Sequence, residues 1–243
     1  MLLTPMFIRK TDVFATSSLP ASPRAESVLS RQFRPEELYP EHFSLSDIEV
    51  SRGDMVFLAY PDLVRNCPSY NYHAHHPGSI VIAIDGACRN NGRYGARASI
   101  GVYHGPGHGW NESARLSPEL RQTNQVAELA ACERALIYAC IIQEHWDDIA
   151  EEIETGKERL YTVVIKSDSE YVVRGMTEWI YKWKANGWVN AKGLPVTNRE
   201  HFGRIDSIVQ SLEDEQVTVQ FWQVPREFNQ EADRLATSAL DSD

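Results

Sequence analysis

A short apolar run that ends in a carboxylate restricts the possible folds of this chain. Residues 80–84 are apolar and mostly β-branched, so they predict a buried strand rather than a helix. Asp85 follows directly, and residues 86–92 after it are rich in turn formers. A charge at the end of a buried strand needs a cation, a metal ion or a hydrogen-bonding partner, because desolvation otherwise neutralises it or destabilises the fold. The alternative is that Asp85 only caps the turn that follows it.

The order of the predicted elements indicates a mixed sheet covered by helices. Apolar runs predict strands over residues 80–84, 98–103, 110–116, 160–166 and 217–224. Helical spacing of apolar residues predicts helices over residues 124–145, 170–185, 198–212 and 229–240, with Asn124, Ser169 or Asp168, and Asn229 as N-caps. The first three strands form a meander, and the later strands alternate with helices. We therefore predict an α/β protein with a mixed sheet flanked by helices.

Four carboxylates stand at comparable places in these elements. Asp85 and Asp168 each follow a predicted buried strand, and Glu128 and Asp233 each lie in the first turns of a predicted helix. If the two strands are neighbours, the four side chains converge and repel one another at neutral pH unless divalent cations bind. Carboxylates suit Mg²⁺ or Mn²⁺, and two such ions ~4 Å apart support phosphoryl displacement, as in a nuclease. The plainer alternative is that Glu128 and Asp233 only stabilise helix N-termini.

Charge and cysteine content exclude several classes of protein. The net charge of −10 argues against attraction to nucleic acid through overall charge, although Lys182, Lys184, Lys192, Arg199 and Arg204 form a local basic group. The cysteines, Cys67, Cys88, Cys132 and Cys140, contain no CxxC pair, so neither a zinc framework nor a disulfide scaffold is predicted. Free thiols suit a reducing compartment, and no apolar run approaches the ~20 residues that span a bilayer. We expect an intracellular protein, nuclear or cytoplasmic, without a membrane span.

The N-terminal third differs in composition from the rest. Residues 1–34 are rich in Ser, Pro and Ala and carry more basic than acidic side chains, so they predict a disordered tail, with a mitochondrial presequence as the alternative. Residues 35–78 are more aromatic, and we expect an extended lead-in packed on the domain, with a strand over 55–59.

Five segments resemble type 1 ribonuclease H of the eukaryotic kind: IDGACRNNG, SIGVYHGPGHGWN, RQTNQVAELAA, IKSDSEYVVRGMTEWIYKWKANGW and NQEADRLA. The resemblance runs from about Ser79 to the C-terminus, so we assign residues 79–243 to a ribonuclease H catalytic domain. It implies a five-stranded mixed sheet with helices on both faces. It also implies an endonuclease that cuts the RNA strand of RNA/DNA hybrids with two Mg²⁺ ions, for which Mn²⁺ can substitute, leaving 3′-hydroxyl and 5′-phosphate ends. We expect the protein to be a monomer.

The resemblance implies a role for each matching residue. The metal-binding catalytic carboxylates are Asp85, Glu128, Asp168 and Asp233, with Asp85 bridging both ions. A pocket for a phosphate of the DNA strand contains Arg121, Thr123 and Asn198, and the groove for DNA sugars and bases contains Tyr171, Trp179 and Trp183. The RNA strand is contacted near its 2′-hydroxyl groups by Cys88, Asn90, Asn91, Asn124 and Gln125.

Two departures from the family pattern leave other functions open. Family members usually carry a histidine in a longer loop between the last strand and the last helix, whereas residues 224–229 are shorter and contain none. We predict slower turnover rather than loss of activity, because metal ions supply most of the transition-state stabilisation. The alternative is a hybrid-binding protein with weak or no catalysis, and a third is DNA strand transfer as in integrase-like relatives. Residues 1–78 do not resemble the small hybrid-binding module of many eukaryotic members.

Overall fold

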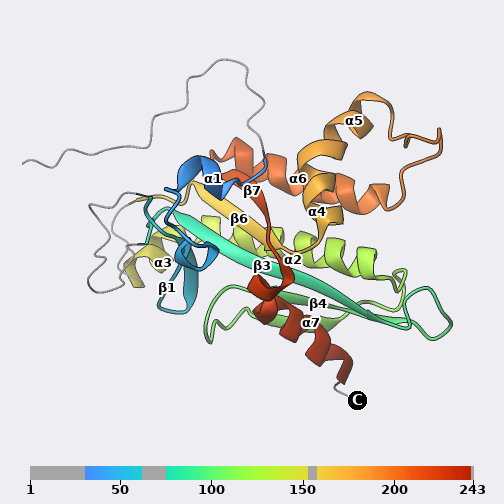
Figure 1. Cartoon of the computed structure of the whole chain (residues 1–243), viewed down its shortest axis with the longest axis horizontal. Helices are drawn as coiled ribbons and strands as arrows, with labels where there is room; N and C mark the ends of the chain where they lie inside the picture. Colours follow the sequence, from blue (N-terminus) through green and yellow to red (C-terminus); the bar gives the residue numbers. More distant parts are fainter. Residues whose placement is uncertain (1–30, 62–74, 153–157, 242–243) are drawn as a thin grey trace, which may run out of the picture.

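The fold is built around a five-stranded mixed sheet. The computed structural model describes residues 31–61, 75–152 and 158–241 (Figure 1). The strands are β3 (Ser79–Arg89), β4 (Arg97–Tyr103), β5 (Glu112–Arg115), β6 (Thr162–Ser167) and β7 (Thr218–Gln223), in the order β5-β4-β3-β6-β7. The pairs β3–β4 and β4–β5 are antiparallel, and β3–β6 and β6–β7 are parallel. The predicted α/β class and mixed sheet are confirmed.

The helices of the domain are α2 (Asn124–Glu144), α3 (Trp146–Glu152), α4 (Glu170–Arg174), α5 (Ile180–Ala185), α6 (Arg199–Asp214) and α7 (Gln230–Asp241). The four predicted helices are present with small shifts at their ends, except that the one predicted over residues 170–185 is divided into α4 and α5; α3 is an additional helix. A π-helical turn, η3 (Gly175–Trp179), joins α4 to α5, and a short turn, η4 (Arg226–Phe228), precedes α7. The N-cap of α2 is Thr123, whose side chain accepts a hydrogen bond from the backbone N–H of Val126, so the expected cap at Asn124 is wrong by one residue. Ser169 caps α4 as expected.

Two glycines show that helices cover both faces of the sheet. Asp85 of β3 pairs with Gly101 of β4, so these two residues lie on the same face of the sheet. The adjacent Gly86 lies on the opposite face. A Cβ atom on Gly86 would lie 2.3 Å from the backbone nitrogen of Glu128 in α2. One on Gly101 would lie 2.2 Å from the carbonyl oxygen of Ala232 in α7. The predicted arrangement of helices on both faces is therefore confirmed.

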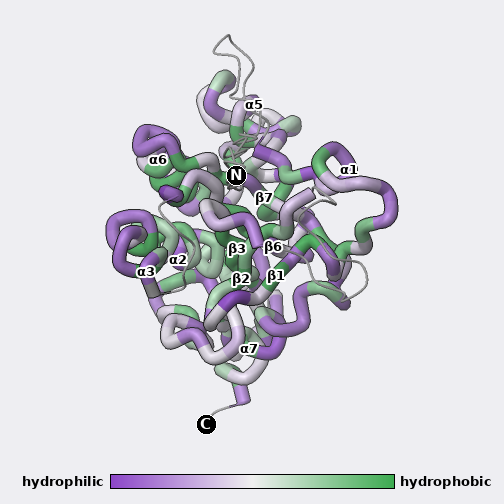
Figure 2. Tube along the Cα trace, turned by 90° about the vertical axis from the view of Figure 1, so that its left-hand side faces the viewer, coloured by the Kyte–Doolittle hydropathy of each residue, from purple (hydrophilic) through white to green (hydrophobic). Residues whose placement is uncertain are grey.

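The core consists of two apolar layers, one on each face of the sheet. The larger layer lies under α2 and contains alternate residues of β3 such as Ile80, Ile82 and Ile84. The smaller one contains Val81 and lies on the face of α7. Figure 2 shows the hydrophobic segments of the central strands inside the molecule and hydrophilic segments around them. No helix in the described part of the chain has the length and apolar character needed to cross a bilayer.

The segment before β3 packs on the smaller apolar layer. It contains α1 (Pro35–Leu38), η1 (Leu45–Asp47) and a hairpin of β1 (Glu49–Arg52) and β2 (Met55–Leu58). Phe33, Ile48 and Val56 are buried in this layer together with Trp222 of β7. Residues 1–30 of the predicted tail and residues 62–74 of the predicted lead-in lie outside the described residues. Residues 31–34, the end of the predicted disordered tail, are ordered beside the sheet, where Gln32 forms a parallel β-bridge with Phe221.

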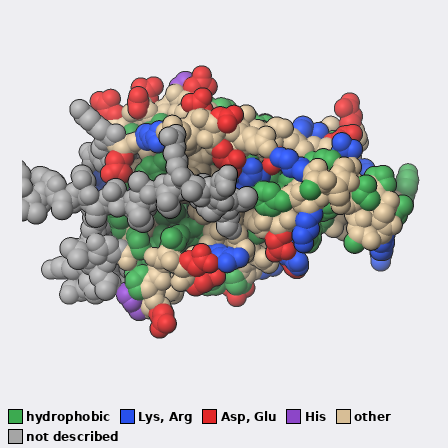
Figure 3. Space-filling model, turned by 90° about the horizontal axis from the view of Figure 1, so that it is seen from above, with side chains coloured by type: hydrophobic (Ala, Val, Ile, Leu, Met, Phe, Trp, Pro, Cys, Tyr) green, Lys and Arg blue, Asp and Glu red, His purple; other side chains and the backbone are tan. Residues whose placement is uncertain are grey.

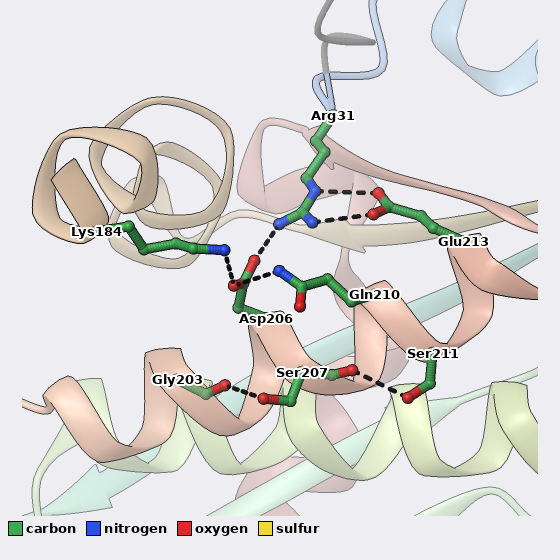
Figure 4. A network of polar contacts seen from close by, with 8 residues as sticks. All are labelled: Arg31, Lys184, Gly203, Asp206, Ser207, Gln210, Ser211 and Glu213. Atoms are coloured by element: carbon green, nitrogen blue, oxygen red, sulfur yellow. Dashed lines mark hydrogen bonds and ion pairs between the residues drawn. The ribbon is translucent and has the colours of Figure 1, made fainter.

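Arg31 anchors this segment to α6 (Figure 4). Its Nη1 donates to Asp206 Oδ1 at 2.6 Å, and its Nε and Nη2 donate to the carboxylate of Glu213 at 3.2 and 3.1 Å. Asp206 also accepts from Lys184 Nζ of α5 at 2.7 Å. One buried carboxylate thus connects the start of the described chain with two helices.

Candidate active site

The ladder between β3 and β6 places two of the predicted carboxylates side by side. Ala83 of β3 pairs with Lys166 of β6, and β6 ends one residue later, at Ser167. Two residues beyond the Ala83–Lys166 pair, Asp85 lies within β3, and Asp168 follows the end of β6. Because β6 has ended there, a pocket opens between β3 and the segment that follows β6, and both carboxylates line it.

Two helices bring the other two carboxylates to the same pocket. The missing side chain of Gly86 lets α2 approach β3 at Glu128 itself, and Gly101 lets α7 approach β4 close to Asp233. Asp85, Glu128, Asp168 and Asp233 thus line one pocket of about 230 Å³. The other lining residues include Cys88 and Asn124 of the predicted RNA contacts, and Arg226.

Neutral donors hold Glu128 and Asp168 in place. Glu128 Oε1 accepts from Asn124 Nδ2 at 2.7 Å, and its Oε2 accepts from Ser169 Oγ at 2.6 Å. Asp168 Oδ1 accepts from Asn229 Nδ2 at 3.2 Å, and the same Nδ2 donates to the carbonyl oxygen of Ile84 at 2.9 Å. The side chain of Asn229, expected to cap α7, is therefore turned toward β3 and Asp168. Each of these side chains meets its carboxylate only in the folded protein, so the sequence did not predict that it orients a carboxylate.

Burial and mutual repulsion raise the proton affinity of the pocket. Burial is the largest cause that raises the pKa of Asp85 to about 7, and the charges of Asp168, Asp233 and Glu128 raise it further, while a backbone hydrogen bond from Gly86 lowers it. The pKa of Glu128 is also raised, first by burial and then by the charge of Asp168, against the hydrogen bonds from Ser169 and Asn124. Both shifts reflect negative charge that the protein holds in a partly buried place.

The carboxylate oxygens of the pocket are suitable ligands for a hard divalent cation. Carboxylate oxygens are the ligands that Mg²⁺ and Mn²⁺ take in proteins, and the raised pKa values indicate negative charge that a cation would stabilise. Within residues 31–61, 75–152 and 158–241, however, no three His, Cys, Asp or Glu side chains form a ready-made metal-binding group. The carboxylates of Glu128, Asp168 and Asp233 instead accept hydrogen bonds from side chains of the protein.

The three predicted groove aromatics form part of a larger aromatic surface. The ring centroids of Tyr171 and Trp179 are 6.1 Å apart, and those of Trp179 and Trp183 are 5.7 Å apart. Trp183 also stacks on Trp188 at 6.1 Å and meets Phe202 edge-on at 5.0 Å. Trp188 and Phe202 are not among the predicted groove residues.

Cations lie over and beside this aromatic surface. Arg174 is 5.2 Å from the ring centroid of Trp179, and Arg199 is 5.5 Å from that of Trp188. Figure 3 shows Lys and Arg side chains among hydrophobic ones toward the end of the molecule that carries α5. Two members of the predicted basic group are paired within the protein, because Lys184 binds Asp206 and Arg204 binds Glu133.

The remaining predicted contacts surround the start of α2 and the start of α6. Arg121 is exposed, Thr123 caps α2, and Asn198 precedes α6 with a φ of 60° and donates through Nδ2 to Tyr171 Oη at 3.2 Å. Among the predicted RNA contacts, Asn91 Oδ1 accepts from the backbone N–H of Asn124 at 3.3 Å. The other members are Cys88, whose Sγ donates to the carbonyl oxygen of Gln122, Asn90, which has a φ of 54°, and Gln125, which is exposed.

The short segment before α7 contributes a residue that sequence reasoning missed. Residues 224–229 contain no histidine, and the side chain of Arg226 lines the pocket and donates to Asp233 Oδ1. The sequence offered one indication of this contact, because Arg226 is the single basic residue of the segment and stands seven positions before Asp233. Its pairing depends on the turn η4, which the sequence did not predict.

Comparisons with known proteins agree with this architecture. The family model described as RNase H matches residues 77–241 of this chain. Ribonuclease H1 of Mus musculus is 36% identical over 162 residues, which are 65% of this chain and 49% of the mouse protein. Ribonuclease H of Methylobacillus flagellatus is 33% identical over 165 residues, which are 67% of this chain and 91% of the bacterial protein. The chain spans about half the length of the mammalian relatives it matches.

Solved structures show a weaker similarity. The crystal structure of LC11-RNase H1 in complex with an RNA/DNA hybrid is 26% identical to this chain, covers 66% of it and 96% of its own length, and superposes with a TM-score of 0.40. This likeness is too low to add to the assignment, which rests on the profile match over residues 77–241 and on the bacterial relative. The sequence resemblance is thereby confirmed, and the chain belongs to the RNase H family.

Proposed function

We propose that this chain is a ribonuclease H, which hydrolyses the RNA strand of RNA/DNA hybrids. The observation that carries the proposal is the pocket into which four elements bring Asp85, Glu128, Asp168 and Asp233. An aromatic surface with cations lies on the helices that follow Asp168, where it suits the backbone and bases of a nucleic acid strand. Membership of the RNase H family supports the same activity.

The four carboxylates would hold divalent cations, Mg²⁺ or Mn²⁺. When bound, such ions lower the pKa of a water molecule and stabilise the charge of an in-line phosphoryl displacement. The protein's own contribution is to position the carboxylates: Asn124 and Ser169 orient Glu128, and Asn229 orients Asp168.

Selection of the hybrid would come from both strands. Tyr171, Trp179 and Trp183 would pack against the DNA strand, for which stacking is independent of sequence. Residues at the rim of the pocket, including Cys88 and Asn124, would lie near the 2′-hydroxyl groups that distinguish RNA from DNA. The monomeric state and the intracellular location stay predictions from the sequence.

A hybrid-binding protein with weak catalysis is the second candidate. The observation that favours it is the pairing of Arg226 with Asp233, in the segment where family members usually carry a histidine. Slow release of product or a weakly held cation would then reduce turnover while binding persists.

Cleavage of labelled substrates tests both candidates. An RNA/DNA hybrid, duplex DNA and duplex RNA are incubated with the full chain in Mg²⁺ and in Mn²⁺, beside the Asp85→Asn variant. We expect metal-dependent cutting of the RNA strand of the hybrid, abolished by the substitution. A hybrid that is bound but intact in both metals would support the second candidate, and cutting of duplex DNA alone would refute the first.

A further inference from the structure

The carboxylate pocket contains a cation of its own. Arg226 is the one basic side chain among the described residues that line it. The turn η4 fixes the backbone at this position, because the N–H of Phe228 donates to the carbonyl oxygen of Pro225 and the N–H of Asn229 donates to that of Arg226. The same turn therefore presents Arg226 to Asp233 and Asn229 to Asp168.

The Arg226–Asp233 pair differs from the other contacts of the pocket. Glu128 and Asp168 are held by neutral side chains, whereas Asp233 is held by a full positive charge. The side chain of Arg226 is 74% exposed and that of Asp233 is 32% exposed. An ion pair open to solvent contributes little free energy, and a long exposed side chain swings away at small cost. This contact can therefore open without unfolding the pocket.

A guanidinium in this position competes with a divalent cation. It occupies an oxygen of Asp233, and its charge repels any ion that the other three carboxylates attract. We propose that Arg226 is a resident counter-cation that must release Asp233 before the pocket holds its full complement of divalent cations. The ion pair thus sets the concentration of free cation at which the pocket fills.

The inference rests on the proposed cation site, and direct binding measurements test it apart from catalysis. Mn²⁺ is titrated into the full chain, without nucleic acid, by isothermal calorimetry. Arg226→Gln removes the charge but keeps a polar side chain of similar reach. We expect roughly threefold to tenfold tighter Mn²⁺ binding in this variant, because one positive charge close to the ion is removed. The effect is moderate because water around the exposed side chain weakens the repulsion.

Arg234→Gln is the matched control. Arg234 is 72% exposed, pairs with Glu231 on the same helix as Asp233, and does not line the pocket. Its replacement makes the same change in net charge, and we expect unchanged Mn²⁺ affinity. Arg226→Lys keeps the charge in the pocket, so its affinity should stay within about twofold of that of the unmodified chain.

The outcomes separate this inference from the proposed function. Tighter binding in Arg226→Gln alone supports it, and loss of that effect in an Asp233→Asn background identifies Asp233 as the site of competition. Equal or weaker binding in Arg226→Gln, with the hybrid still cleaved, overturns the inference and leaves the nuclease in place. Absence of Mn²⁺ binding in every variant, with the hybrid intact, overturns both.

Discussion

Arg31 and Asp206 are separated by 175 positions in the sequence, yet their side chains form a buried ion pair with Nη1 and Oδ1 2.6 Å apart. Asp206 is shared with Lys184, and Glu213 binds the other side of the guanidinium. The segment that precedes the family match is therefore fixed to α6 by a charge network. This gives a direct test of whether that segment is part of the folded unit.

Arg31→Ala should lower the free energy of unfolding. The substitution removes a buried donor from Asp206, which retains Lys184, so we expect a loss on the order of 2 kcal/mol rather than the larger loss of an isolated buried charge. Urea unfolding followed by tryptophan fluorescence measures it. Arg34→Ala is the control, because Arg34 forms an exposed pair with Glu37 and should change stability by less than about 0.5 kcal/mol. Equal effects would show that the network does not anchor the segment.

Gly86→Ala should damage both the fold and the pocket. A Cβ atom there would lie 2.3 Å from the backbone nitrogen of Glu128, so α2 must move away from β3 and take the Glu128 carboxylate with it. We expect destabilisation by about 2 kcal/mol or more and loss of most cleavage activity. Gly203→Ala is the control in α6, where a Cβ atom meets nothing within 4 Å, and it should stabilise the helix by up to about 1 kcal/mol. Full activity in Gly86→Ala would contradict the close approach of α2.

Asp85→Asn should stabilise the metal-free protein at neutral and alkaline pH. The pKa of Asp85 is raised to about 7, so between its ordinary value and about 7 the folded protein binds more protons than the unfolded chain. The stability of the unmodified protein therefore falls as the pH rises through this window, by on the order of 2–4 kcal/mol. Asparagine does not titrate and escapes this loss.

Urea unfolding in the presence of a chelator, from about pH 4 to about pH 8, tests this prediction. The advantage of Asp85→Asn should be near zero at the acidic end and largest at the alkaline end. Added Mg²⁺ should reduce it, because a bound cation stabilises the carboxylate of the unmodified protein. An advantage that is the same at every pH would mean that packing, rather than charge, explains the difference.

Asn229→Ala should impair the reaction more than it impairs the fold. The side chain holds both the carbonyl oxygen of Ile84 and the Asp168 carboxylate, so its removal leaves a buried acceptor unpaired and lets Asp168 turn. We expect a loss of stability of about 1–3 kcal/mol and at least about a tenfold lower kcat. The informative measurement is the Mg²⁺ concentration for half-maximal rate, which should rise. An unchanged metal requirement at reduced stability would assign Asn229 a structural role only.

The sequence predicted those parts of the site that depend on pattern within one element. Asp168 follows the end of β6 as expected, but Asp85 lies within β3, which continues to Arg89, so the predicted strand end at residue 84 was wrong. The two carboxylates still come together, because β3 and β6 run in parallel and Ala83 pairs with Lys166. The choice between Thr123 and Asn124 as the cap of α2 could not be made this way, since both residue types are good N-caps and stand next to each other.

Contacts between distant elements were beyond such rules. Arg31 binds partners more than a hundred positions away, and the direction of the Asn229 side chain depends on the packing of α7 against β3 and β4. Arg226 is exposed along most of its length, so no burial pattern in the sequence marks it. These residues take their roles from tertiary neighbours that periodicity does not encode.

The π-helical turn η3 sets the angular phase of the aromatic surface. Tyr171 and Trp179 are eight residues apart, and in an uninterrupted α-helix that spacing would turn their side chains about 80° away from each other. A π turn absorbs one extra residue, which reduces the offset to about 20° and leaves both rings on one side of the helix. A one-residue insertion or deletion in this turn would rotate α5, with Trp183, by about 100° relative to α4. The row of rings therefore depends on a residue count as much as on the aromatic residues themselves.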